Sequence, residues 1–376
     1  MTRIEADWIS SDASQKVCRL LTDAGYQAWF VGGCVRNALL GEPVVDLDLS
    51  TDALPDQVMA LAEQAGFKVI PTGIDHGTVT LVVADVPFEV TTFRRDVATD
   101  GRRATVAFAD NMKDDARRRD FTINALYAGP DGVIADPLGG LADLSARRVR
   151  FIEDADQRIK EDYLRILRFF RFHAWYGQNG PDPEGLAACA ANVDGLARLS
   201  VERVTSEMLK LLAAPDPAPA MASMAATGAL AQILPGAEAV LLAVLVHVEE
   251  QARLSPDPIR RLAILGGAPE VALRLSKEQK KRLEQIGSNI SHAEAAYRFG
   301  TAIGMDRLAI EAASLGQEID DETGRSVQEA VDQIFPLAAA DLMPALQGAA
   351  LGEALKAAEA RWIASGFTLT KADLLD

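Results

Sequence analysis

The chain has 376 residues and a formal net charge of −16 at pH 7. Its 49% hydrophobic and 24% charged residues are typical of a soluble globular protein, here with two or more domains. It has no apolar run of about 18 residues and no apolar signal core at its start, so we expect no membrane span and no export signal. Three scattered cysteines and four isolated histidines argue against a disulfide framework or a zinc site and favour a reducing cytoplasm.

Residues 11–24 are predicted to form a packing helix from the spacing of their apolar residues. Trp29–Val31 is then typical of a short buried strand, and Gly32-Gly33 allows a tight turn that brings the backbone close to a ligand. The next predicted helix, over residues 34–40, ends at Gly41. Its free N–H groups and positive end would point at the glycine turn, which favours phosphate binding.

A second strand, expected over residues 44–49, carries two carboxylates. Side chains alternate along a strand, so Asp46 and Asp48 would share one face, about 7 Å apart, with Val45 and the two leucines on the other. Such a pair is a hard oxygen site for Mg²⁺. Beside a phosphate-binding turn it indicates phosphoryl or nucleotidyl transfer, in which metal ions clamp the attacking and leaving oxygens. The alternative is a surface strand with two solvated aspartates.

Further elements complete a small mixed sheet with helices on one side. They are a helix over 55–65 and strands over 67–70, 79–84 and 88–93. The last strand contains Glu89 between apolar neighbours, where a carboxylate is costly unless it is paired or binds a metal. The alternative is a hairpin glutamate that faces water. Residues 96–110 have weak periodicity and are interpreted as a mobile loop near the site.

Positive charge is concentrated between residues 94 and 172, which carry 14 arginines and 2 lysines against 12 aspartates and 2 glutamates. This zone can contact phosphate, unless its arginines pair with the interleaved aspartates. Within it, Arg118 and Arg119 can present forked donors to triphosphate or ribose oxygens. Asp120 could accept from a ribose hydroxyl or hold an arginine, and Asn124, one helical turn later, could face the same site. The alternative is a helix start with a basic cap.

Residues 154–172 are predicted to form one continuous helix. Asp162 and Arg165 would then be neighbours on one side, with Arg168 on the same face. An aspartate that accepts from an exocyclic amine and an arginine that donates to the ring could select cytosine and adenine, at roughly 1–3 kcal/mol per contact. The alternative is an ordinary salt bridge, worth about 0.2–0.5 kcal/mol, which the residues alone favour.

The rest of the chain is predicted to be helical. A helix that begins near residue 200 is interpreted as structural. Residues 309–376 carry no chemical signature. A local basic face could contact RNA, although a solvated charged face is the alternative. It consists of Lys277, Lys280, Lys281 and Arg282.

Several of these motifs together resemble one family. Gly-Gly-x-Val-Arg at 32–36, Leu-Leu-Gly at 39–41 and Asp-x-Asp at 46–48 are similar to the head domain of class II tRNA nucleotidyltransferases (CCA-adding enzymes) and bacterial poly(A) polymerases. The family's Arg-Arg-Asp-Phe-Thr-Ile-Asn-Ala run stands intact at 118–125, and its Glu-Asp-x-x-Arg template for the incoming nucleotide at 161–165. The resemblance covers roughly residues 25–235. One departure is Asn37, where many members have aspartate.

The resemblance implies an α+β fold. It has a nucleotidyltransferase head with a small mixed β-sheet over residues 1–145, a helical neck for base and RNA binding over 146–235, and a helical body and tail over 236–376 that contacts tRNA. Asp46 and Asp48 would bind Mg²⁺, with Glu89 as a third acidic residue that serves as ligand or base. The nucleotide-binding set would be Gly32, Gly33, Arg36, Arg118, Arg119, Asp120, Asn124, Asp162, Arg165 and Arg168.

The implied reaction is template-independent addition of CCA to the 3′ end of tRNA from CTP and ATP, with release of pyrophosphate. The tRNA would be held by its 3′ end and acceptor/T arm, and no obligatory protein partner is evident. Alternatives are a poly(A) polymerase, A-only or CC-only addition, a nucleotidyltransferase for a small molecule, and an RNA-binding module with an inactive head. The acidic chain lacks the basic segments suited to general RNA, which favours tRNA.

Overall fold

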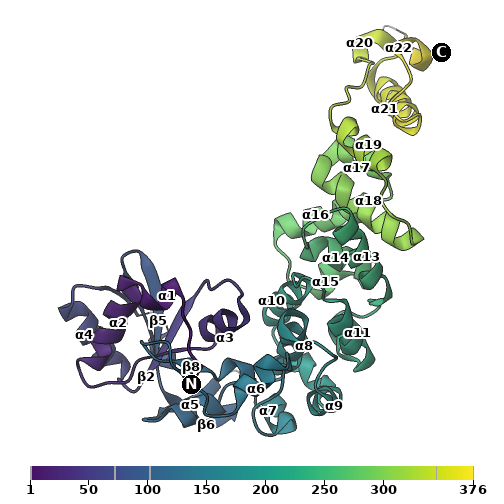
Figure 1. Ribbon diagram of the computed structural model, residues 1–376. Coiled ribbons are helices and arrows are strands. Elements are labelled where there is room, and N and C mark those ends of the chain that lie inside the picture. The colour runs from purple at the N-terminus through teal and green to yellow at the C-terminus, as the bar shows by residue number, and fades with distance from the viewer. Residues whose placement is uncertain (1, 72, 101–102, 344, 376) are drawn as a thin grey trace. The chain divides into compact units, whose positions relative to one another are not determined.

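The computed structural model describes the chain except residues 1, 72, 101–102, 344 and 376 (Figure 1). The chain forms two compact units. The first comprises Met1–Leu211 and Pro219–Ile233, and the second Leu212–Ala218 and Leu234–Asp376. The predicted boundary at residue 145 lies inside the first unit, so the three-part division of head, neck and body stays a prediction.

The first unit contains a seven-stranded mixed sheet in the order β3-β4-β5-β2-β1-β8-β9. The central pair, β2 and β5, is parallel, and the other described pairs of this sheet are antiparallel. The predicted α+β class with a small mixed sheet is confirmed. The strands are β1 (Trp29–Val31), β2 (Leu47–Thr51), β3 (Lys68–Ile70), β4 (Thr78–Val83), β5 (Val86–Thr92), β8 (Tyr127–Ala128) and β9 (Ile134–Ala135).

Helices cover this sheet, with α3 on β1 and β2 and α4 on β3 and β4. Apolar residues that alternate along the strands bury its core, among them Phe30, Leu49 and Phe88, each fully buried. The helices of this part are α1 (Asp7–Ser10), α2 (Asp12–Thr22), α3 (Gly33–Leu40), α4 (Pro55–Gln64), α5 (Met112–Arg117) and α6 (Gly140–Ser145), with 3₁₀ turns η1 (Ile74–His76) and η2 (Thr122–Asn124).

The segment interpreted as a mobile loop forms a second, two-stranded sheet instead. Strands β6 (Arg94–Asp100) and β7 (Arg103–Phe108) pair antiparallel, with an irregularity between Asp96 and Ala98. The centre of the Asp-Gly-Arg-Arg run, residues 101–102, lies outside the described residues. The prediction of a loop without strands was wrong, because two extended runs can pair through their backbones without any apolar periodicity.

The remaining helices of the first unit pack on the head through aromatic rings. Phe121, which follows α5, contacts Phe151 with ring centroids 4.9 Å apart and Phe172 with centroids 5.1 Å apart. These contacts hold Phe172 against the segment that follows α5. These elements are α7 (Ala155–Glu161), α8 (Leu164–Tyr176), α9 (Pro183–Ala191), η3 (Val193–Arg198), α10 (Val201–Leu212), α11 (Ala218–Ala226) and α12 (Ala229–Ile233).

The predicted single helix over 154–172 is in fact two helices with a break at Asp162. Its backbone is extended, with φ −154° and ψ 107°. The carboxylate of Asp162 accepts from the backbone N–H of Leu164, the first residue of α8, at 3.1 Å. Aspartate favours such local bonds over a helix interior, and this explains why continuous apolar spacing failed to reveal the break.

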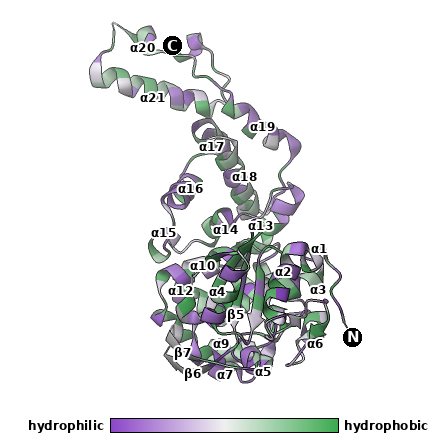
Figure 2. Ribbon diagram, turned by 90° about the vertical axis from the view of Figure 1, so that its left-hand side faces the viewer, coloured by the Kyte–Doolittle hydropathy of each residue, from purple (hydrophilic) through white to green (hydrophobic). Residues whose placement is uncertain are grey.

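The regular elements that the structure describes in the second unit are helices, joined by short loops. Figure 2 shows that its ribbons carry both hydrophobic and hydrophilic residues, as expected for amphipathic helices. One core lies between α13 and α18 and another around Trp362 near the end of the chain. The helices are α13 (Val240–Gln251), α14 (Pro258–Leu265), α15 (Pro269–Ala272), α16 (Lys277–Gly287), α17 (His292–Phe299), α18 (Thr301–Leu315), α19 (Asp321–Val331), α20 (Ala339–Leu342), α21 (Gly348–Ala364) and α22 (Lys371–Leu375).

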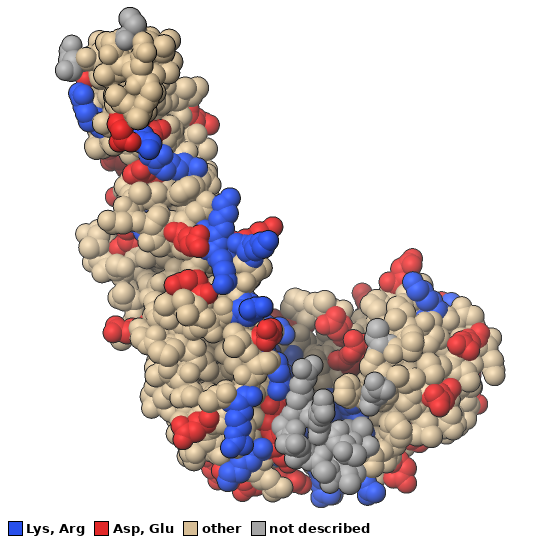
Figure 3. All heavy atoms as spheres, turned by 180° about the vertical axis from the view of Figure 1, so that it is seen from behind, with Lys and Arg blue, Asp and Glu red and all other residues tan. Residues whose placement is uncertain are grey.

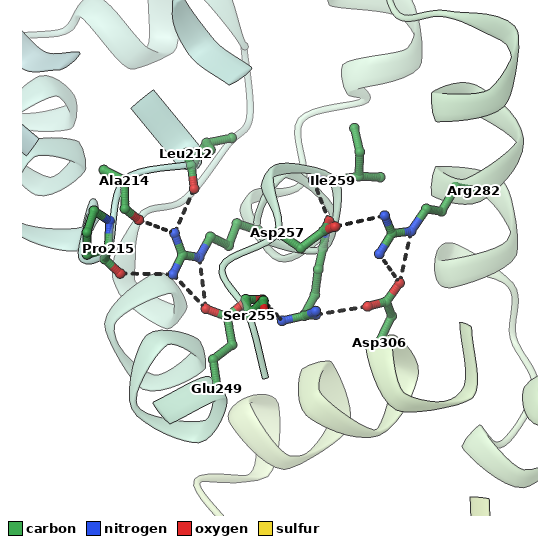
Figure 4. Close-up of polar contacts among 11 residues, drawn as sticks. Leu212, Ala214, Pro215, Glu249, Ser255, Asp257, Ile259, Arg282 and Asp306 are labelled. Carbon is green, nitrogen blue, oxygen red and sulfur yellow. Dashed lines mark hydrogen bonds and ion pairs between the residues drawn. The ribbon is translucent and has the colours of Figure 1, made fainter. Parts of the chain in front are cut away.

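A buried ionic network joins α13, α14 and α18 (Figure 4). Arg260 donates to Glu249 at 2.7 Å and to Asp306 at 2.9 Å. Arg261, only 1% exposed, donates to Glu249 at 2.8 Å and to the backbone carbonyl of Leu212 at 2.7 Å. Buried carboxylates are tolerated only when they are paired in this way, so the network constrains how these helices pack.

No described helix is long and apolar enough to cross a membrane. All three cysteines are buried and free.

Candidate active site

A cavity of about 670 Å³ in the first unit is lined by all ten residues expected to bind nucleotide. This volume is within the range of small-molecule sites, roughly 300–1,000 Å³. Its lining combines a glycine turn, carboxylates and many arginines, which is the chemistry of a polyphosphate and metal site. The lining residues are Gly32, Gly33, Arg36, Asp46, Asp48, Arg118, Arg119, Asp120, Asn124, Asp162, Leu164, Arg165, Arg168, Arg171, Phe172 and Arg203.

The glycine turn connects β1 to α3 at the cavity wall. Gly32 has φ 73° and ψ −121°, a conformation that side-chain-bearing residues rarely adopt. A Cβ at Gly32 would lie 3.5 Å from the guanidinium of Arg119. The eight-residue helix α3 begins at Gly33, so its first N–H groups lie at the same wall as that guanidinium. Both favour an anionic group here.

Asp46 and Asp48 both line the cavity, although they do not share a strand. The strand begins at Leu47, so Asp46 is an exposed residue that precedes it, and Val45 is 85% exposed rather than turned to the core. Asp48 lies directly opposite Glu89 on the parallel strand β5. Burial, together with the charge of Glu89, raises the pKa of Asp48 to about 6. Crowded carboxylates at a cavity wall fit a divalent cation, which would relieve their repulsion.

Glu89 differs from the two aspartates in its placement. It is exposed and does not line the cavity. Within the described residues, no three metal-ligating side chains form a ready-made cluster. Mg²⁺ is commonly held by one or two carboxylates plus substrate phosphates, so the Asp46 and Asp48 oxygens suffice as protein ligands for a metal that arrives with a nucleotide.

Arg118 and Arg119 are held by a residue that sequence reasoning missed. The fully buried carboxylate of Asp115 accepts from Arg118 at 3.0 Å, from Arg119 at 2.9 Å and from the Tyr127 hydroxyl at 2.8 Å. Burial alone would raise the pKa of Asp115, but the two guanidinium groups hold it well below its usual range. Its spacing of three and four residues from the arginines was the available signal.

Asp120 holds an arginine, which was one of its two expected roles. Its carboxylate pairs with Arg168 of α8 and accepts from the Asn124 amide at 2.9 Å. The Asn124 oxygen accepts from Arg36 at 2.5 Å. Asn124 thus faces the same site as expected, but through a 3₁₀ turn rather than an α-helix. Although burial opposes it, Arg168 keeps the pKa of Asp120 below its usual range.

Arg36 is only 7% exposed and is engaged on several sides. Its guanidinium lies 4.0 Å from the centroid of the Tyr176 ring and donates to the Tyr176 hydroxyl at 2.8 Å. It also donates to the amide oxygen of Asn37 at 2.8 Å, and Asn37 donates to the carbonyl of Pro43 at 2.8 Å. The amide at position 37 can do both, whereas a carboxylate there would lack the donor for Pro43.

The salt bridge between Asp162 and Arg165, which was the alternative to base selection, is absent from their described side-chain contacts. Arg165 pairs with Glu161 at 2.5 Å, and Asp162 pairs with Arg203 of α10 at 2.6 Å. The backbone N–H of Arg165 still donates to the carbonyl of Asp162 at 3.0 Å, but each side chain pairs with another residue. Both still line the cavity, so they can contact one ligand from separate supports. Arg203 was not in the expected set.

The basic face on α16 divides into two kinds of residue. Lys277 and Lys281 are exposed and Lys280 is partly exposed, whereas Arg282 pairs with Asp257 at 2.8 Å and with Asp306 at 2.6 Å. Figure 3 shows basic side chains with acidic ones beside them on the face it displays. The lysines therefore remain candidates for RNA contact, and Arg282 extends the ionic network of Figure 4.

Arg282→Ala is expected to lower the free energy of unfolding by about 1–3 kcal/mol, because it leaves two carboxylates short of a donor. Lys281→Ala is the matched control, with a change in the free energy of unfolding within about 0.5 kcal/mol. If Lys281 contacts RNA, its loss should also reduce the salt dependence of RNA binding by about one phosphate contact. Thermal melts and tRNA titrations at several salt concentrations measure both. Weaker tRNA binding by Arg282→Ala, with an unchanged melt, would instead make Arg282 an RNA contact.

Comparison with known proteins agrees with this geometry. Residues 28–150 match the family described as "Poly A polymerase head domain" and residues 181–241 the family described as "Probable RNA and SrmB- binding site of polymerase A". The chain is 44% identical over 223 residues to the CCA-adding enzyme of Geobacillus thermodenitrificans, which covers 58% of this chain and 54% of that protein. It is 41% identical over 208 residues to the human mitochondrial CCA tRNA nucleotidyltransferase 1, a match that covers 54% of this chain and 47% of that protein.

A solved structure extends the likeness beyond the region of high identity. The crystal structure of the Bacillus stearothermophilus CCA-adding enzyme in complex with CTP has a TM-score of 0.71 and 28% identity, and it covers 94% of this chain and 92% of that one. By sequence, the chain spans about half the length of the curated relatives it matches. We conclude that residues 28–150 form a domain of the poly(A) polymerase head family and that the chain resembles CCA-adding enzymes in sequence over about half its length and in fold over most of it.

Proposed function

We propose that the chain adds CCA to the 3′ end of tRNA from CTP and ATP, without a nucleic-acid template, and releases pyrophosphate. The observation that carries the proposal is one cavity of the first unit, which is lined by Asp46, Asp48 and the N-terminus of α3 together with Asp162 and Arg165. Relatives that share its domains are named CCA-adding enzymes and CCA tRNA nucleotidyltransferases. The cavity thus combines groups for triphosphate, metal and base.

The triphosphate would bind at the glycine turn, where backbone N–H groups meet the guanidinium groups of Arg118 and Arg119. Because Asp115 orients both arginines before the nucleotide arrives, little reorganisation is needed when charge develops on the α-phosphate. The 3′ hydroxyl of the RNA would attack that phosphorus, and its proton would pass to a nearby carboxylate or to water. Asp46 and Asp48 would hold the divalent metal, which we take to be Mg²⁺ and which would supply Lewis-acid stabilisation of phosphate oxygens.

Base selection is assigned to Asp162 and Arg165. Cytosine and adenine both present an exocyclic amine beside a ring acceptor, whereas uracil and guanine present a carbonyl at the amine position. An ionised aspartate only accepts, and an arginine only donates. The pair would therefore match CTP and ATP. With UTP or GTP, the carbonyl oxygen of the base would face the Asp162 carboxylate, so that two acceptors would oppose each other.

The principal rival is a poly(A) polymerase on the same scaffold, since one matched domain carries that name. The net charge of −16 favours a defined partner such as tRNA over RNA in general. The exposed lysines of α16 would contact tRNA. In this proposal the head transfers the nucleotide, the neck binds its base, and the second unit binds the tRNA body. Three free, buried thiols fit a reducing compartment, which supports a cytoplasmic location.

The proposal is tested by nucleotide incorporation into three tRNA transcripts that end at the discriminator base, at C and at CC. Labelled CTP or ATP is supplied singly and together, with and without Mg²⁺. We expect two C and then one A, after which addition stops, and no product after chelation. A long run of A on any RNA with CTP ignored would identify a poly(A) polymerase, and addition that stops after CC or needs a CC end would identify a partial enzyme.

A further inference from the structure

Arg203 on α10 forms a two-point ion pair with Asp162 inside the cavity. One terminal nitrogen of its guanidinium lies 2.6 Å from Oδ2 of Asp162 and the other lies 3.2 Å from Oδ1. The two side chains are 27% and 23% exposed, so the pair is largely shielded from water. A two-point pair of this kind fixes the plane of a carboxylate as well as its position.

Asp162 has little else to hold its side chain. Its backbone is extended between α7 and α8, and the described bonds of its carboxylate are those from Arg203 and from the Leu164 N–H. The direction in which its oxygens face the cavity is therefore set largely by α10, 41 residues away in the chain.

Arg165 is supported differently. It donates to Glu161 at 2.5 Å and to the carbonyl of Arg158 at 2.7 Å, both within the adjoining helix α7. A longer bond of 3.4 Å joins Arg165 to the carbonyl of Arg118 at the end of α5, so the donor for the base is held from α7 and α5, whereas the acceptor for the base is held from α10. A change at Arg203 can disturb the acceptor and leave the donor in place.

We propose that Arg203 is a positioning residue that determines base selectivity by holding the Asp162 carboxylate in the orientation that accepts from an exocyclic amine. This inference rests on the proposed function. A carboxylate that is free to turn meets the amine of cytosine or adenine in only part of its orientations, and it no longer opposes a carbonyl at a fixed point. Selectivity against UTP and GTP then falls, because discrimination depends on geometry as well as charge.

The test compares the wild type with Arg203→Ala, Arg203→Lys, Asp162→Ala and the Arg203→Ala/Asp162→Ala double variant. Lys210→Ala is the matched control, since Lys210 is an exposed cation on the same helix that does not line the cavity. For each protein, kcat/KM is measured with CTP and UTP on a tRNA that ends at the discriminator base, and with ATP and GTP on one that ends at CC. Thermal melts accompany the kinetics.

Arg203→Ala is expected to lower the CTP/UTP and ATP/GTP ratios of kcat/KM by roughly 10-fold to 100-fold, the range of one base contact. Arg203→Lys, which keeps one charged donor, is expected to lie between the wild type and alanine. The double variant should show the selectivity of Asp162→Ala alone, because Arg203 acts through that carboxylate. Lys210→Ala should keep the wild-type ratios.

If Arg203→Ala lowers kcat/KM by the same factor with all four nucleotides, Arg203 has only a structural role and the inference is overturned. Lower selectivity in the double variant than in Asp162→Ala would mean that Arg203 meets the base itself, which also overturns it. Where Arg203→Ala melts below the assay temperature, the Arg203→Lys ratios decide, and wild-type selectivity there counts against the inference. A wild type that adds neither C nor A refutes the proposed function and the inference with it, whereas an active wild type isolates the inference.

Discussion

Replacing Asp48 with asparagine is expected to lower nucleotide incorporation by about 10³-fold or more, which corresponds to roughly 4 kcal/mol of lost transition-state stabilisation. The amide keeps the shape of the side chain but removes a charged oxygen at the wall of the cavity beside Asp46. The same change is expected to leave the melting temperature unchanged or higher. Asp48 is crowded by Glu89 and by burial, and a neutral side chain relieves both penalties.

Steady-state incorporation and thermal melts with and without Mg²⁺ measure these effects. Mg²⁺ should raise the melting temperature of the wild type, because it binds the folded state, and the rise should be smaller in Asp48→Asn. Asp56→Asn is the matched control, since Asp56 is an exposed carboxylate in the first turn of α4. Activity of Asp48→Asn within tenfold of the wild type would remove Asp48 from the metal site.

Replacing Asp115 with alanine is expected to destabilise the first unit by about 3–5 kcal/mol, because it leaves two partly buried arginines and a buried tyrosine hydroxyl without their shared acceptor. Arg118 and Arg119 would also lose their orientation toward the cavity. In Asp115→Asn, which retains the volume, we expect a smaller loss of stability. Its nucleotide incorporation should nevertheless fall by about 100-fold, the scale of a displaced positioning group.

Acid titration provides a second measurement on the same residue. The pKa of Asp115 in the folded protein lies below the value of about 3.9 expected for an unfolded aspartate. A lowered pKa means that the ionised side chain stabilises the fold at neutral pH and that this contribution is lost as the pH falls below about 4. When the pH is lowered from 5 to below 4, the free energy of unfolding of Asp115→Asn should therefore fall by less than that of the wild type. Asp114→Asn, one residue earlier on α5, is the control, and equal acid sensitivity in Asp115→Asn would contradict the assignment.

Local patterns in the sequence determined a large part of this molecule. The glycine turn before α3, the alternation that buries Leu47 and Leu49 around Asp48, and the cap and apolar signals of the helices are set by neighbours within a few residues. The mixed sheet followed from the order of such elements. Asp46 and Asp48 were selected because two carboxylates at this spacing, one helix after a glycine turn, suit a divalent cation, and their role as metal ligands stays a prediction.

Only the tertiary structure decided which charged groups meet. In the sequence Asp162 and Arg165 stand three residues apart, as neighbours on a helix would. The helix is interrupted at Asp162, however, and Asp162 pairs with Arg203 while Arg165 pairs with Glu161. The spacing of Asp115 from Arg118 and Arg119 allowed two ion pairs but did not show that both form in a buried site, and nothing near Arg282 in the sequence indicated its pairing with Asp257 and Asp306. The physical reason is that a long side chain can reach several carboxylates, and burial of the surrounding elements, which no local pattern encodes, selects among them.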